Sequence, residues 1–177
     1  TALARELGWS EEKVELLQYA ALIHDLGKVA ISEGILKKEG KLTASGFARM
    51  KEHSFIGSTI IKDIKFLAGG ADIIKHHHER WDGQGYPDGL KGELIPEGAR
   101  ILAVADAFDA MTSDRSYRQA LDISTAIQEI KEGAGTQFDP RIAEVFIRII
   151  PRLNLEEKTK SSGDFIYNQA IVAETES

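Results

Sequence analysis

The sequence contains no cysteine among its 177 residues. Disulfide bonds, zinc sites with thiolate ligands and iron–sulfur clusters are therefore excluded. Any metal ion that this protein binds must be held by nitrogen and oxygen atoms. The absence of cysteine also agrees with a reducing compartment such as the cytoplasm.

Long apolar runs and an excess of positive charge are also absent. No stretch approaches the roughly 18 apolar residues of a membrane span, and no signal peptide is recognisable, so we expect a cytoplasmic protein. Lysine and arginine total 22 against 28 aspartate and glutamate residues, which gives a formal net charge of −6. Proteins that bind long nucleic acids through the phosphates are usually basic, so we expect no DNA or RNA partner. A small anionic ligand remains compatible, because bound metal ions would supply local positive charge.

The pattern of apolar residues indicates helices, with no convincing strand and no internal repeat. We predict one all-α domain over residues 1–153 and a polar extension over 154–177. Between 82 and 98, five glycines and two prolines predict a long loop. The predicted helices cover residues 11–27, 43–50, 56–67, 71–79, 99–111, 124–132 and 140–150.

Imidazoles and carboxylates recur in four short segments of the chain. They are HDLGK (24–28), KEHSFIG (51–57), HHERWDGQGYP (77–87) and ILAVADAFDA (101–110). Taken alone, an HD pair is usually a surface or capping pair, and a lone His53 is more often structural. Asp106 is less easily dismissed, because a carboxylate inside an apolar helix is costly unless a positive charge pairs with it. Together the segments predict a hydrolytic metal site.

Three consecutive histidines, His76, His77 and His78, precede the loop. They can be read as a solvated run or as metal ligands. Adjacent residues on a helix point about 100° apart, so the three rings cannot all bind one ion. Two of them can face a cluster of ions while the third faces elsewhere.

In this order the HDLGK, HHE and GYP segments, followed by RSYR at 115–118, resemble the HD-GYP family. These are the HD-domain phosphodiesterases of bacterial cyclic di-GMP signalling, and the likeness extends from about residue 3 to about residue 146. The resemblance implies an all-α HD-domain helical bundle with a long Gly/Pro-rich GYP loop. It also implies two or three divalent metal ions, iron or manganese, with zinc as the alternative. The implied metal ligands are His24, Asp25, His53, His77, His78 and Asp106.

Within that ligand set, the resemblance makes Asp25 the bridge between two ions and leaves His76 as a non-ligand. Members of the family usually carry one more histidine on a helix upstream of the HD pair, and residues 1–23 contain none. We therefore expect that the chain begins inside the family's first helix. Either the sequence is a truncated fragment, or one metal site is short of a ligand.

The activity implied by the resemblance is hydrolysis of cyclic di-GMP to pGpG, and onward to GMP, by a hydroxide that bridges the metal ions. Lys28 is expected to contact a phosphate oxygen or to protonate the leaving group, and Asp25 to act with the metals. Tyr86 is expected at the rim of the pocket, with a place on a protein-interaction surface as the alternative. The implied substrate contacts are completed by Arg115, Tyr117 and Arg118, whose guanidinium and aromatic groups suit phosphates and bases.

Glu79 and Asp82 are expected to orient the ligating histidines, with a structural capping role as the alternative. Two further hypotheses for the whole domain stay open: a non-catalytic module that binds the dinucleotide or docks a diguanylate cyclase (GGDEF) domain, and a phosphohydrolase of another nucleotide. The resemblance also implies an upstream sensory or receiver domain in a longer regulator. Pairing of two chains into a homodimer is left open.

Overall fold

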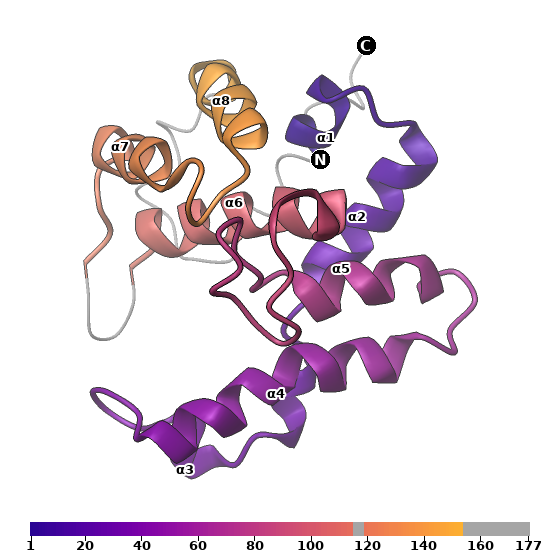
Figure 1. Cartoon of the computed structure of the whole chain (residues 1–177), viewed down its shortest axis with the longest axis vertical. Coiled ribbons are helices and arrows are strands. Elements are labelled where there is room, and N and C mark those ends of the chain that lie inside the picture. The colour runs from indigo at the N-terminus through magenta and orange to yellow at the C-terminus, as the bar shows by residue number, and fades with distance from the viewer. Residues whose placement is uncertain (115–118, 154–177) are drawn as a thin grey trace.

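The computed structural model describes residues 1–114 and 119–153. Within those ranges the chain forms α-helices joined by loops and short 3-10 turns, with no strand, so the all-α fold class is confirmed (Figure 1). None of the described helices combines the length and the apolarity that a membrane span requires. The α-helices are α1 (Ala2–Glu6), α2 (Glu11–Ile23), α3 (Glu33–Leu36), α4 (Ala44–Ile61), α5 (Ala71–His76), α6 (Glu97–Thr112), α7 (Ile123–Gly133) and α8 (Pro140–Ile149).

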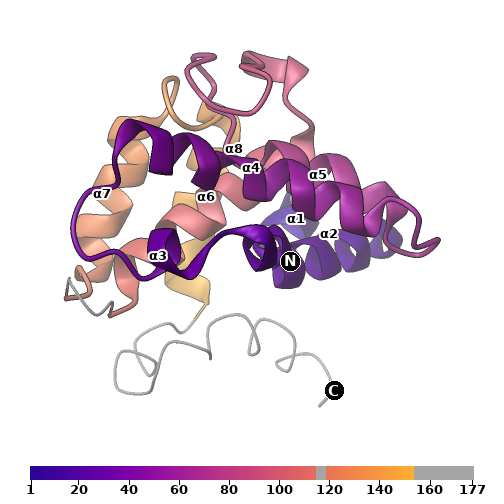
Figure 2. The same cartoon turned by 90° about the horizontal axis from the view of Figure 1, so that it is seen from below.

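Helix α6 runs through the middle of the molecule and carries much of the core. Its apolar residues Ala99, Leu102 and Val104 are almost completely buried, as are Ile130 on α7 and Ile142 on α8. Helices α7 and α8 pack on one side of α6, and α2 and α5 pack on the other (Figure 1). The loop between α5 and α6 projects beyond α4 and α5 when the molecule is turned by 90° (Figure 2). This loop is the one predicted from its glycines and prolines.

Helix α4 differs from the prediction, which placed two shorter helices over the same region. The predicted capping residue is correct, because Thr43 Oγ1 accepts a hydrogen bond of 3.1 Å from the Gly46 N–H group. The helix then continues without a break to Ile61. The apolar pattern is interrupted by His53 and Ser54, which are 1% and 0% exposed. Polar residues on the buried side of the helix therefore hid its continuity.

Two predicted helix ends were also wrong by several residues. Helix α2 ends at Ile23, not at residue 27, and Asp25 is the N-cap residue of a 3-10 turn, η1 (Leu26–Ala30). Helix α5 ends at His76, not at residue 79. As a result, His24, Asp25, His77 and His78 lie where a helix has just ended and not inside it.

A buried ion pair attaches α8 to α6. Arg100 Nη1 donates a hydrogen bond of 2.5 Å to Asp139 Oδ2, and the two side chains are 12% and 3% exposed. Asp139 also accepts hydrogen bonds from the backbone N–H groups of Arg141 and Ile142 at the start of α8. This carboxylate thus caps one helix and neutralises a cation on another.

We expect Asp139→Ala to lower the free energy of unfolding by about 3 kcal/mol, because it leaves a buried guanidinium without its counter-charge and removes a helix cap. Chemical denaturation followed by circular dichroism would measure the change. Asp122→Ala, which removes the exposed cap of α7, should have a clearly smaller effect. Equal effects of the two substitutions would contradict the role assigned to the ion pair.

Candidate metal centre

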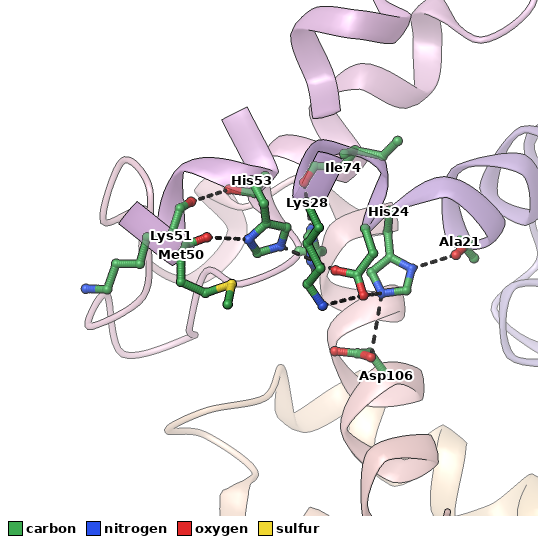
Figure 3. A network of polar contacts seen from close by, with 11 residues as sticks. Ala21, His24, Lys28, Met50, Lys51, His53, Ile74 and Asp106 are labelled. Atoms are coloured by element: carbon green, nitrogen blue, oxygen red, sulfur yellow. Dashed lines mark hydrogen bonds and ion pairs between the residues drawn. The ribbon is translucent and has the colours of Figure 1, made fainter. Parts of the chain in front are cut away.

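The six predicted metal ligands come from four separate parts of the fold, because His24 and Asp25 are neighbours in one turn. His24 follows α2, Asp25 precedes η1, His53 lies in α4, the pair His77 and His78 follows α5, and Asp106 lies in α6. His24 and His53 lie on opposite sides of Lys28 (Figure 3). The fold therefore gathers residues that are up to 82 positions apart, as counted from residues 24 and 106 of the sequence.

Asp25 lies between two of the histidines and faces each with a different oxygen. Its Oδ1 is 3.5 Å from His53 Nε2, and its Oδ2 is 3.5 Å from His24 Nε2. Asp106 Oδ1 lies 3.8 Å from His24 Nε2 on the other side. A carboxylate in this position can contact two ions at once, one through each oxygen.

The possible ligand atoms form two overlapping groups. His53, His77 and His78 make one group, and His24, Asp25 and His77 make the other, with the ligand atoms of each group within 4.8 Å of one another. His77 belongs to both groups. This overlap is what a site for two neighbouring ions requires.

The orientation of the rings is fixed by the backbone. In His24, His53 and His77, the Nδ1 atom lies 2.7 Å from the carbonyl oxygen three residues earlier. A carbonyl oxygen can only accept a hydrogen bond, so Nδ1 must carry the proton. The lone pair of each Nε2 is therefore directed into the site, as metal coordination requires.

Two of these nitrogens are buried polar atoms in need of a partner. Among the described residues, neither His53 Nε2 nor His77 Nε2 has a hydrogen-bond partner. Burial lowers the pKa of His53, burial lowers that of His77 well below 6.5, and burial lowers that of His78 to about 3. Protonation is thus disfavoured, and a buried neutral nitrogen without a partner is costly. A divalent metal ion fits these donors, because it is bound by the neutral form of imidazole.

Asp25 is ionised, although it is partly buried. Burial would raise the pKa of this carboxyl, but the hydrogen bond from Lys28, together with His24 and His53, brings it below its usual value. The Lys28 Nζ atom donates to Asp25 Oδ2 at 2.6 Å. Since the Lys28 side chain is 41% exposed, its ammonium group is also accessible to a ligand.

The GYP loop adds an aromatic wall to the site. The ring of Tyr86 lies 4.9 Å from that of His78, with an angle of 33° between the planes. A side chain at Gly85 would place its Cβ atom 2.4 Å from the Cα atom of Glu79, so this close approach of the loop requires glycine. Tyr86, predicted at the rim of the pocket, therefore lies directly against a candidate ligand.

The remaining polar residues of this region have other partners. Both ring nitrogens of His76 are engaged, one with a carbonyl oxygen and one with Asp88 Oδ2 at 3.0 Å, in agreement with its expected exclusion from the ligands. Glu79 accepts a hydrogen bond from the Asp88 N–H group, and Asp82 pairs with Arg80. The ring N–H groups of His24, His53 and His77 donate to carbonyl oxygens instead. The orienting role of Glu79 and Asp82 remains a prediction.

Comparison with known proteins decides the family. The model of the HD domain family matches residues 1–142. The chain belongs to the HD domain family. The HD pair at residues 24 and 25, which lies at the centre of the candidate site, falls within the matched region.

Proteins that are similar in sequence to this HD domain are named as phosphodiesterases of cyclic dinucleotides. A protein of Xanthomonas campestris pv. campestris named cyclic di-GMP phosphodiesterase response regulator RpfG is 45% identical over 148 residues, which cover 82% of this chain and 39% of that protein. A Vibrio cholerae protein named 3'3'-cGAMP-specific phosphodiesterase 2 is 37% identical over 147 residues, covering 82% of this chain and 28% of that protein.

A solved structure agrees with the fold. A Bdellovibrio bacteriovorus protein described as an HDG"Y"P protein matches with a TM-score of 0.66 at 22% identity, over 85% of this chain and 48% of that chain. The predicted HD-GYP resemblance and the HD-domain fold are thus confirmed. This HD domain spans less than half the length of each of these three proteins.

One residue that positions the site escaped the sequence analysis. Gly27 was interpreted only as the end of a helix, but a Cβ atom on it would lie 1.9 Å from the His53 carbonyl oxygen and 2.6 Å from the Gly57 nitrogen. The turn that carries Asp25 and Lys28 therefore packs directly on the backbone of α4. The glycine of HDLGK is visible in the sequence, but the sequence does not show that Gly27 packs against Gly57.

The predicted substrate contacts are only partly covered by the structure. Lys28 and Tyr86 lie at the candidate metal centre of this HD domain. Arg115, Tyr117 and Arg118 lie outside the described residues. Their contacts with substrate remain predictions.

Proposed function

We propose that this HD domain is a metal-dependent phosphodiesterase that hydrolyses cyclic di-GMP to pGpG and onward to GMP. The observation that carries the proposal is the position of Asp25, which faces His24 and His53 through different oxygens. Beside it, His53 and His77 direct buried nitrogens that have no hydrogen-bond partner among the described residues into the same space. Such a set of donors suits two adjacent divalent ions better than any structural role.

The six candidate ligands would hold iron or manganese, with zinc as the alternative, because only nitrogen and oxygen donors are present. Bound divalent ions supply Lewis acidity and activate a water molecule toward a phosphodiester. The chain itself contributes Lys28, which is within reach of a phosphate oxygen or of the leaving alkoxide. Arg115 and Arg118 are proposed to bind the phosphates, since guanidinium groups match them with forked hydrogen bonds.

The choice of substrate rests on the relatives. The Xanthomonas protein, at 45% identity, is named for cyclic di-GMP, whereas the Vibrio protein, at 37% identity, is named for 3'3'-cGAMP. Cyclic di-GMP is therefore our first choice and cyclic GMP–AMP the second. Since the Xanthomonas relative is named a response regulator, we also propose that this domain works behind a sensory or receiver domain. Contact with a GGDEF domain and homodimer formation remain open predictions.

The test is a product assay on the purified chain, supplied with manganese or, under anaerobic conditions, with ferrous iron. We expect cyclic di-GMP to be converted to pGpG or GMP, and we expect a chelator to stop the conversion. Cyclic GMP–AMP is assayed in parallel, so that the ratio of the two rates assigns the substrate. Bound metal and bound dinucleotide without turnover would contradict the proposal and favour a receptor module.

A further inference from the structure

A continuous series of aromatic rings leads from the candidate ligands to the protein surface. His77 and His78 have ring centroids 3.9 Å apart, and Tyr86 lies 4.9 Å from His78. Phe47 lies 6.5 Å from Tyr86 and meets it edge-on, at 79°. Burial falls along this series, from His77, which is 1% exposed, to Phe47, which is 48% exposed. The outermost ring is therefore partly accessible from solvent beside the candidate metal centre.

A positive charge is held at the same place. The Lys51 Nζ atom lies 4.7 Å from the centroid of the Phe47 ring and 5.2 Å from that of the Tyr86 ring. Both distances are within the range of cation–π attraction, so the two rings fix the position of the ammonium group. Lys51 lies on the far side of His53 from Asp106 (Figure 3). The charge is thus located to one side of the candidate metal ligands.

This arrangement matches the part of a cyclic dinucleotide that does not react. Such a molecule carries two phosphates and two bases, and only one phosphate can occupy the metal centre. The other half must lie beside the centre and presents a flat purine and a negative charge. Phe47 offers an aromatic face for the purine, since base–aromatic stacking is favourable for every base. Lys51 offers the matching positive charge for the second phosphate.

We propose that Phe47 and Lys51 bind the non-reacting half of a cyclic dinucleotide, Phe47 by stacking on a purine and Lys51 by pairing with the phosphate remote from the metals. The inference rests on the proposed function and adds a specificity site to it. A simpler role for Phe47, packing against Tyr86 to support the loop, would need only its apolar volume. The two roles can be separated by substitution.

Phe47→Leu keeps an apolar side chain of similar reach but removes the aromatic face, and Phe47→Trp retains a face. We expect Phe47→Leu to raise the KM for cyclic di-GMP about tenfold, with a smaller effect on kcat, and Phe47→Trp to stay near the wild-type KM. Lys51→Met keeps the length of the side chain and removes the charge, and we expect a KM increase of about fivefold. The controls Phe66→Leu and Lys65→Met change exposed residues beyond the C-terminal end of α4, well away from Phe47 and Lys51, and should leave KM unaltered.

A second readout distinguishes binding of the remote half from damage to the metal centre. Bis(p-nitrophenyl) phosphate has one phosphodiester and no second nucleotide. In Phe47→Leu and Lys51→Met, the ratio of kcat/KM for cyclic di-GMP to that for this small ester should fall, while metal content stays at the wild-type level. An unchanged ratio, or a KM for cyclic di-GMP equal to that of the wild type, would overturn the proposal.

Equilibrium binding of cyclic di-GMP to the metal-loaded protein separates failure of this proposal from failure of the proposed function. If the wild type binds but does not hydrolyse the dinucleotide, the enzyme assignment fails, and weaker binding by Phe47→Leu and Lys51→Met would still support the remote site. If the wild type hydrolyses the dinucleotide and both variants bind it equally well, only the remote site is overturned. Absence of binding by the wild type would overturn both.

Discussion

Replacing Asp25 with alanine is expected to abolish both metal binding and phosphodiesterase activity. Asp25 contacts three other members of the site: it lies 3.5 Å from nitrogens of His24 and His53 and accepts a hydrogen bond from Lys28. The substitution removes the carboxylate that is proposed to bridge two ions, and it would leave the Lys28 ammonium to repel a bound cation. Loss of a residue that only orients a ligand costs about 10–100-fold in metal affinity, so loss of this ligand should cost at least about 100-fold.

Metal content by elemental analysis and the rate of cyclic di-GMP hydrolysis are the two measurements. Asp63→Ala, which removes an exposed carboxylate just beyond α4, serves as the control and should match the wild type in both. Asp25→Asn preserves the shape of the side chain and should lie between the control and Asp25→Ala in metal affinity. An Asp25→Ala protein with normal metal content and a normal rate would show that the site has been placed wrongly.

Gly27→Ala is expected to disturb the candidate metal centre indirectly, because Gly27 is not one of the proposed ligands but packs against the backbone of α4. The added methyl group would collide with the carbonyl oxygen of His53, a backbone atom that cannot turn aside. The turn η1 must then move away from α4, and Asp25 and Lys28 move with it relative to His53. We expect the free energy of unfolding to fall by about 1–3 kcal/mol, as for other overpacked positions, and metal content and activity to fall as well.

Gly34→Ala is the matched control, because a Cβ atom on Gly34 would meet no heavy atom within 4 Å. Gly34 lies in the short helix α3, where alanine is favoured over glycine, so its replacement should leave stability unchanged or raise it slightly. Thermal unfolding of both variants, with metal analysis of the same samples, makes the comparison. Equal stability of the two variants would contradict the close packing of η1 on α4.

Much of this fold could be predicted, because most of its helices alternate polar and apolar residues in the helical period. Helices α7 and α8 were predicted almost to the residue, and each begins after an aspartate that caps it. Helix α4 was divided in two because His53 and Ser54 interrupt its apolar face. Where a polar functional residue lies on the buried face of a helix, the pattern of apolar residues no longer identifies that helix.

The residues of the candidate site could be proposed from the sequence, but their arrangement in space could not. The HD pair and the histidine pair are visible in the sequence, and the resemblance to a family joined them. The contact of Gly27 with α4 and the position of Phe47 beside Tyr86 depend on segments that meet only in the folded chain. Phe47 stands in no recognisable motif, and Lys51 begins the KEHSFIG segment without being a candidate ligand, so only the structure associates these two residues with substrate binding.

The attachment of the histidine rings to backbone carbonyls has a consequence for the charge of the site. Because these acceptors are uncharged, they add nothing to the negative charge of Asp25 and Asp106, and the imidazole ligands are themselves neutral. Two divalent ions would bring more positive charge than these two carboxylates neutralise. The occupied centre would therefore be a local region of positive potential in a protein whose formal net charge is −6. An acidic chain could in this way attract a doubly negative dinucleotide to a single point on its surface while repelling anions elsewhere.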